Sequence, residues 1–162
     1  MNSKSIYNAT TDWCDRIGYP YTKKYDDKSN YGEINTQISC KGKFQMVDYR
    51  IEIEDEFCLA RTFLPIRAYE EDEIKTMILI SYINSFIKSG AFVLKIQTGE
   101  IFYRVGTFLS EDTRISDETI SDMLLCSRHM LSKYGDAFAN VLCGNMDPKE
   151  AFIEAIEIKD KA

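Results

Sequence analysis

The chain has 162 residues, of which 44% are hydrophobic and 28% charged, and its formal net charge is −6. This length suits a single domain over residues 1–162, with enough apolar residues for a core. No run approaches the roughly 20 apolar residues of a membrane span, and the N-terminus lacks the apolar stretch of a secretory signal, so we expect a cytoplasmic protein. The negative charge disfavours nucleic acid as a partner, because an acidic surface repels phosphate.

The first predicted element is a helix over residues 3–17. Its apolar residues recur at helical spacing, and Gly18 and Pro20 end it. The next segment, about 19–32, is polar and rich in tyrosine, and we predict a surface loop. We expect its tyrosines to pack within the loop. The alternative is a recognition surface, for which tyrosine is typical. The four residues concerned are Tyr19, Tyr21, Tyr25 and Tyr31.

Three strands of an antiparallel meander follow the loop. Apolar and polar residues alternate from Ile34 to Cys40 and again from Val47 to Glu54, the period of a strand with one buried face. After a turn at Asp55 and Glu56, a third strand runs from Phe57 to Leu64. We expect Pro65 to end the meander, with one face of its strands in water.

A helix from Glu70 to about Lys88 follows, and its four leading carboxylates complement the positive end of the helix dipole. Apolar residues cover about half of its circumference, more than one sheet face can bury. Either a second subunit covers the surplus, or the N-terminal or the C-terminal helix does so within the chain. The apolar residues are Ile78, Leu79, Tyr82, Ile83, Phe86 and Ile87.

A hairpin and two helices complete the chain. The strands flank Thr98 and Gly99, with Phe92 and Leu94 predicted in the core. Ser116 has the residue type of a helix N-cap, and we expect Gly135 to break or bend the helix that follows. Asp147 and Pro148 mark the start of a last helix.

No motif for chemistry is present in the sequence. His129 is the only histidine, which leaves a histidine zinc site or a catalytic dyad without support. The five cysteines are scattered without a C-x-x-C pair, and most are expected to be buried. Glu52, Glu54 and the turn carboxylates are predicted to be solvated. We therefore predict no catalytic residue, no metal site and no cofactor.

The arginines on the predicted strands have two interpretations. Arg50, Arg61 and Arg104 suit cross-strand pairing with acidic residues, and they also suit binding of an anion. A polar cleft near Tyr49, Arg61 and Arg104 is the form that a small-molecule sensor or an unrecognised enzyme would take.

The block from Ile83 to about Ile156 resembles the YbjN family of bacterial proteins, whose fold is that of the type III secretion chaperones. The resemblance rests on Ile83-Asn84, Gly90-Ala91-Phe92, Gly99-Glu100-Ile101, Tyr103-Arg104, the Ser116 cap and the region of Ala155 after Pro148. It implies an α+β fold, with a five-stranded antiparallel sheet flanked by helices in the order α-β-β-β-α-β-β-α. The family is described as regulators of sensory transduction, and it offers no enzymatic residue to carry over.

The expected function is therefore that of a non-enzymatic module, chaperone-like or regulatory, that binds a polypeptide client or a regulatory protein. Secretion chaperones of this fold are dimers, so the resemblance implies a homodimer through helix 74–87 and strand 91–97. The candidate interface residues are Ile78, Tyr82, Phe86 and Val93, with the two aromatic residues as anchors.

Overall fold

The computed structural model describes residues 3–109 and 114–158, and it is an α+β protein with one antiparallel sheet. The sheet has six strands in the order β1-β2-β3-β4-β6-β5. The elements in chain order are α1 (Ser3–Ile17), β1 (Thr22–Asp26), β2 (Tyr31–Ser39), β3 (Met46–Glu54), β4 (Phe57–Arg67), α2 (Glu73–Phe86), β5 (Ala91–Lys95), β6 (Glu100–Phe108), α3 (Asp117–Leu142) and α4 (Pro148–Glu157).

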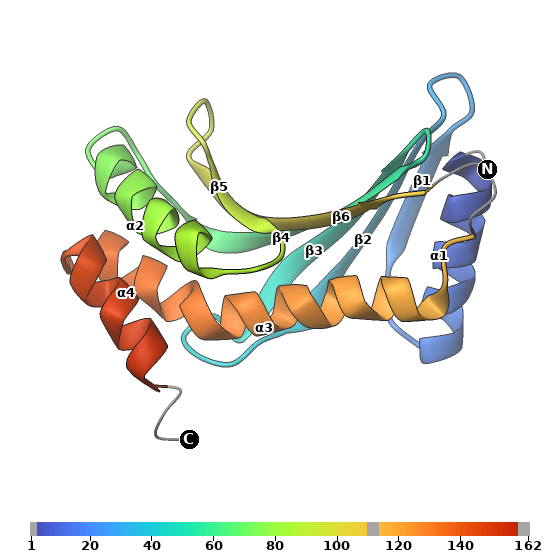
Figure 1. Ribbon diagram of the computed structural model, residues 1–162. Helices are drawn as coiled ribbons and strands as arrows, with labels where there is room; N and C mark the ends of the chain where they lie inside the picture. The colour runs from blue at the N-terminus through green and yellow to red at the C-terminus, as the bar shows by residue number, and fades with distance from the viewer. Residues whose placement is uncertain (1–2, 110–113, 159–162) are drawn as a thin grey trace.

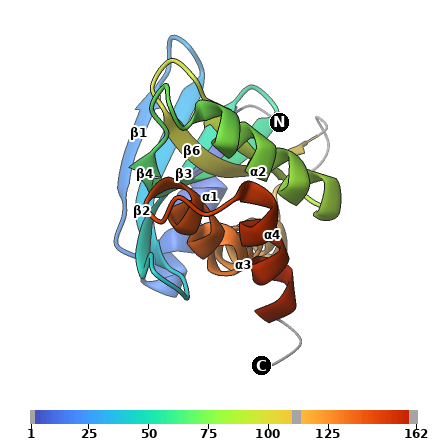
Figure 2. The same ribbon diagram turned by 90° about the vertical axis from the view of Figure 1, so that its left-hand side faces the viewer.

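The helices lie on one side of the sheet and at its ends (Figure 1). The long helix α3 runs along one face, where it contacts β4 and β6, and α1 covers the same face at β2 and β3. At the other end α2 contacts β5, and α2, α3 and α4 pack together, as the turned view shows (Figure 2). No helix of the described residues lies on the opposite face, and the sheet curves so that this face is concave (Figure 1).

The core lies between α3, α1 and the covered face. Tyr49, Phe92, Tyr103, Tyr134 and Phe138 are its largest fully buried residues. The ring of Phe92 contacts three of them, with centroids 5.1–6.0 Å apart. Because successive strand residues point to opposite faces, the alternation in β3 directs Tyr49 into this core and Arg50 onto the open face.

Several predicted elements are confirmed. Helix α1, the meander, the hairpin and both C-terminal helices have the predicted types. The caps also form, since Ser116 Oγ accepts a hydrogen bond from the Thr119 amide and an Asp147 carboxylate oxygen accepts from Lys149 and Glu150.

The predicted tyrosine-rich loop is wrong, because residues 22–26 form a sixth strand. β1 pairs antiparallel with β2, with Thr22 opposite Asn35 and Asp26 opposite Tyr31. Its exposed residues show no apolar alternation, and the strand is held by backbone pairing, which does not depend on side-chain type. The sheet therefore has six strands rather than the five that the resemblance implies, and the chain closes with the two helices predicted from the sequence pattern rather than the one helix of the implied order.

Two predicted breaks are also wrong. β4 continues through Pro65 to Arg67, with an irregular register between Phe63 and Arg67 that accommodates the proline. Helix α3 continues through Gly135, where an added Cβ would lie 3.3 Å from the ring of Phe44. That glycine allows close approach of the loop before β3 rather than a bend in the helix.

Candidate site on the open face of the sheet

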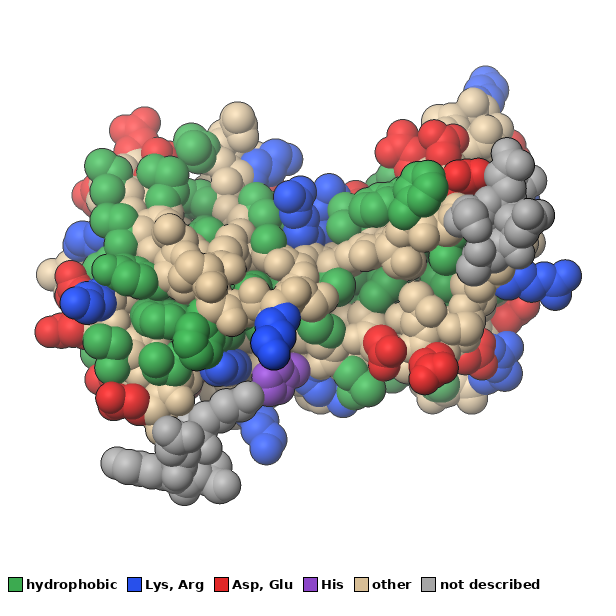
Figure 3. Space-filling model, in the orientation of Figure 1, with side chains coloured by type: hydrophobic (Ala, Val, Ile, Leu, Met, Phe, Trp, Pro, Cys, Tyr) green, Lys and Arg blue, Asp and Glu red, His purple; other side chains and the backbone are tan. Residues whose placement is uncertain are grey.

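The open face of the sheet is the candidate functional site. The strand register determines which residues lie on this face, since residues directly opposite each other on neighbouring strands point to the same side. Arg50 lies opposite Asn35 and Arg61, and Arg61 lies opposite Arg104. Figure 3 shows this face as a hollow between two raised ends of the molecule, with Lys and Arg side chains at its floor.

A hydrogen-bond network fixes the polar side chains across β2, β3 and β4. The Tyr31 hydroxyl donates to Glu52 at 3.0 Å and to Glu33 at 3.2 Å, and Glu52 also forms an ion pair with Arg61. Glu33 accepts from the amide of Asn35 at 2.7 Å. The side chains of this network are therefore held in place before any partner arrives, which reduces the entropy lost on binding.

The arginines also cover aromatic rings. The guanidinium of Arg50 lies 5.1 Å from the ring centroid of Phe63, and that of Arg61 lies 5.5 Å from Phe102. The two rings are 5.4 Å apart and tilted. These distances are those of cation–π pairs. The open face thus alternates charge with aromatic area.

The electrostatics of this network favour an ionised Glu33 and a neutral Tyr31 over proton transfer. The Asn35 amide that donates to Glu33 holds the pKa of that carboxyl below its usual value. Burial, together with the hydrogen bond to Glu52, raises the pKa of Tyr31. Neither group is therefore poised to exchange a proton near neutral pH.

A hollow of about 630 Å³ lies where β4 is irregular. Asn35, Asp48, Arg50, Phe63 and Arg67 are among the residues that line it. Arg67 lies 3.8 Å from Glu100 on β6 and donates to a backbone oxygen. The irregular register therefore opens a polar recess on the face that carries the arginines.

The predicted cleft of Tyr49, Arg61 and Arg104 is wrong in its composition. Tyr49 is fully buried on the helix-covered face, and burial raises the pKa of its hydroxyl. Arg61 and Arg104 lie on the opposite face, because Tyr49 pairs with Thr62 rather than with Arg61. Cross-strand pairing holds for Arg61, whereas Arg104 is exposed and has no ion-pair partner among residues 3–109 and 114–158.

The predicted interface residues lie at the other end of the molecule. Ile78 and Phe86 are exposed, and Tyr82 and Val93 are half-buried. The ring of Tyr82 stacks on Phe152 of α4 at 5.6 Å, and Phe86 meets the edge of the same ring at 5.8 Å. Part of the apolar surplus is therefore covered within the chain by α4, and the homodimer stays a prediction.

Three of the tyrosines of the predicted loop are held by contacts with α1 and α3. Tyr25 packs on Tyr7 with centroids 5.0 Å apart, and the Tyr21 hydroxyl donates to Asp15. Arg128 of α3 donates to the Tyr19 hydroxyl. Only Tyr31 belongs to the open-face network, so the four tyrosines do not form one surface.

Sequence reasoning missed the way in which the outer edge of β5 is closed. The Asn84 side chain in α2 accepts a hydrogen bond from the Phe92 amide at 2.9 Å and donates to the Phe92 carbonyl at 3.0 Å. It takes the place of a neighbouring strand at that residue. An asparagine on the polar stripe of a helix that precedes a strand was the available signal.

No protein-family model matches the chain, and the searches of curated proteins and of solved structures gave no significant match. Within the described residues, no group of three His, Cys, Asp or Glu side chains is placed to hold a metal ion. In the same residues, no helix combines the length and the apolar character needed to cross a membrane.

Proposed function

We propose that this protein is a non-enzymatic module that binds a polypeptide segment along the open face of its sheet. The observation that carries the proposal is the pre-organised set of arginine and aromatic side chains on a concave face that no helix among residues 3–109 and 114–158 covers. Arginine and aromatic residues supply much of the binding energy in protein interfaces.

The extent of this face favours a polypeptide over a small ligand. The nine residues of β3 span roughly 30 Å at about 3.3 Å each, so the face is long enough for an extended segment of similar length. One recess lies beside Arg50 and Arg67, and a second, of about 570 Å³, lies at the turn between β3 and β4. The first recess lies at Arg50 and Phe63 and the second at Glu54 and Phe57, so the two are separated along β3 and β4. A segment that runs along these strands contacts both recesses, whereas a small molecule fills only one.

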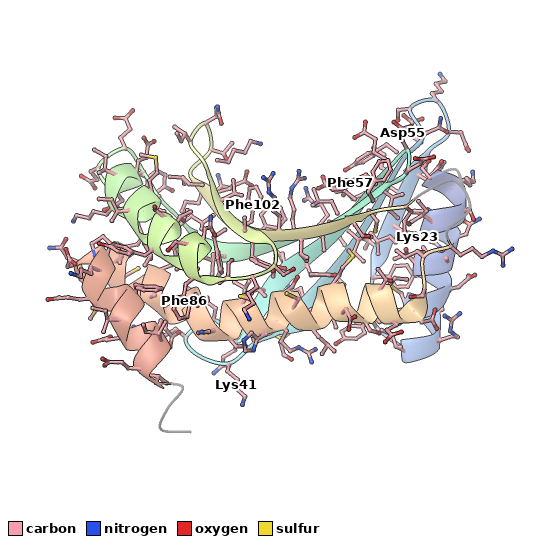
Figure 4. All side chains as sticks on the ribbon, in the orientation of Figure 1. Lys23, Lys41, Asp55, Phe57, Phe86 and Phe102 are labelled. Carbon is pink, nitrogen blue, oxygen red and sulfur yellow. The ribbon has the colours of Figure 1, made fainter. Side chains whose placement is uncertain are left out.

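A peptide selection tests the proposal. Random twelve-residue peptides displayed on phage are selected on the immobilised protein, and their affinities are measured by fluorescence polarisation. We expect Arg104→Glu to weaken binding at least tenfold. The matched control is Lys41→Glu, an exposed lysine beyond α3 on the other side of the molecule (Figure 4). Equal loss in the two variants, or a selection that enriches no sequence, would refute the proposal.

The finer assignment to a secretion-chaperone-like fold, and with it the YbjN resemblance, belongs to the same proposal. An antiparallel sheet with helices on one face supports it, and the sixth strand β1 is a departure from the five strands that the resemblance implies. A cytoplasmic role as a chaperone or a regulator is the corresponding functional proposal.

We also propose that the protein is a homodimer through α2. Ile74, Met77 and Ile78 are 67%, 41% and 44% exposed, which is costly for large apolar side chains in water. Further along the same side of the helix lie the exposed, smaller residues Ser81 and Ser85. In an antiparallel two-fold pair, Ile74 and Ile78 face Ser85 and Ser81 of the second copy, so large side chains meet small ones.

Charge supports the same arrangement. Glu71 and Glu73 lie at the start of α2, and Lys88 follows its end. The two-fold pair places Lys88 near the acidic start of the second helix, so each end attracts the other. The proposed anchors are therefore Ile74 and Ile78, one to two turns before Tyr82 and Phe86, whose rings contact α4 within the chain.

Sedimentation velocity tests the dimer. We expect the wild-type protein at about 20 μM to sediment as a dimer and Ile74→Glu together with Ile78→Glu to give a folded monomer. Exposed Ile153 on α4 supplies the control, because Ile153→Glu alters an apolar surface outside the proposed pair. A wild-type monomer at this concentration would end the dimer proposal and leave peptide binding untouched.

A further inference from the structure

Phe57 and Phe108 form an exposed aromatic pair at one end of the open face. They lie directly opposite each other on β4 and β6. Phe57 is 41% exposed and Phe108 is 70% exposed. Two adjacent phenylalanines left in water, on a face that no described helix covers, are typical of a surface that a partner covers.

The position of Phe57 is fixed by a glycine on the neighbouring strand. A Cβ added at Gly106 would lie 3.0 Å from Phe57 Cζ and 3.1 Å from Leu59 Cδ1. The ring of Phe57 therefore lies against the backbone of β6. A residue larger than glycine at position 106 would displace the ring from this place. Phe57 is a pre-placed floor for the second recess, of about 570 Å³, and Phe108 lies beside it.

Carboxylates border this apolar floor on one side, and Ser3 of α1 and Asn30 also line the recess. Glu54, Asp55 and Glu56 line the same recess in the turn between β3 and β4. None of the three has an ion-pair partner within the described part of the chain. Figure 4 shows Asp55 at the tip of this turn, with Phe57 just below it on the open side, and Figure 3 shows acidic side chains gathered at that end.

We propose that this recess binds a lysine or arginine side chain of the polypeptide partner together with an apolar neighbour. This inference rests on the proposed function and adds the chemistry of the partner. The methylene stem of a basic residue covers the phenyl rings, and its charged head reaches the carboxylates at the rim. A purely apolar segment would leave the carboxylates partly desolvated, and an acidic segment would be repelled.

The rest of the chain supports a basic partner. The net charge of −6 steers cations toward the protein. At the centre of the open face, Glu33 and Glu52 are already hydrogen-bonded to side chains of the protein itself. Glu54, Asp55 and Glu56 have no ion-pair partner among the described residues and lie next to exposed aromatic area, so the basic residue is expected at this end of the bound segment.

Three labelled peptides of eight residues test the inference, with leucine alternating with lysine, glutamine or glutamate. We expect fluorescence polarisation to give the tightest binding for the lysine peptide and the weakest for the glutamate peptide. Glu54→Gln with Glu56→Gln should weaken the lysine peptide at least tenfold at 50 mM salt. Phe57→Ser with Phe108→Ser should abolish the preference for lysine, with circular dichroism confirming that the variant is folded.

A control pair separates this site from general attraction. Glu118→Gln with Asp122→Asn removes the same charge from exposed positions on α3 and should change the affinity less than twofold. Equal loss in the two charge pairs, tight binding of the glutamate peptide, or no binding of any peptide at 1 mM would overturn the inference. If library peptides respond to Arg104→Glu but not to the phenylalanine variants, the proposed function stands and this inference fails.

Discussion

Asn84 closes the outer edge of β5, and replacing it with alanine tests this role of its side chain. The side chain of Asn84 makes two hydrogen bonds to the backbone of Phe92. Its oxygen accepts from the Phe92 amide, and its nitrogen donates to the Phe92 carbonyl. Phe92 is 1% exposed and its ring lies in the core. Asn84→Ala therefore leaves an edge residue with a buried side chain and two unpaired backbone groups.

The expected cost follows from these two bonds. Each contributes about 0.5–1.5 kcal/mol, so their loss costs about 1–3 kcal/mol. Alanine favours a helix over asparagine by about 0.5 kcal/mol, which offsets part of the loss. We expect a net destabilisation of about 0.5–2.5 kcal/mol. The neighbouring Ser85→Ala is the control, because the Ser85 hydroxyl donates only within α2, to the Tyr82 carbonyl.

Urea unfolding gives the free energies, and hydrogen exchange of the Phe92 amide gives the local effect. Asn84→Ala should lower the protection of that amide more than the protection of amides in β3. Loss of the edge bonds should also make β5 available for pairing between molecules, so we expect more aggregation on concentration. A variant as stable as Ser85→Ala with unchanged exchange at Phe92 would show that Asn84 does not hold the edge.

Three other outcomes are expected. Gly90→Ala should lower the free energy of unfolding in urea by about 2 kcal/mol or more, because φ is 67° and a methyl group there would lie 2.2 Å from the hydroxyl of buried Tyr103. Gly18→Ala is the control, since its φ of 72° carries the same backbone strain but the methyl group meets open space, and it should cost only about 1 kcal/mol. The folded pKa of Glu33 lies below its unfolded value, so its stabilisation is complete above pH 5 and is lost as the pH falls through the folded pKa; Glu33→Gln should flatten this part of the pH profile. A thiol reagent at pH 8 should modify exposed Cys143 within minutes, and Cys58 only on unfolding, because burial raises the pKa of that thiol to about 12.

Sequence patterns predicted the elements whose side chains alternate between core and water. β3 is the clearest case, since Tyr49, Ile51 and Ile53 are all buried and their polar neighbours lie on the other face. The helix starts at Ser116 and Asp147 were equally readable, because an N-cap depends on residues within one turn. Local spacing is sufficient wherever the determining interaction is itself local.

The tertiary structure alone decided the rest. β1 has exposed lysines and no apolar period, and it is a strand because β2 offers its backbone groups as partners. Arg61 and Tyr49 were placed in one cleft, although the strand register puts them on opposite faces. Phe57 and Phe108 are 51 residues apart in the sequence and adjacent only through the pairing of β4 with β6. Register and edge pairing depend on which distant strands meet, and that information lies in the whole core rather than in any one segment.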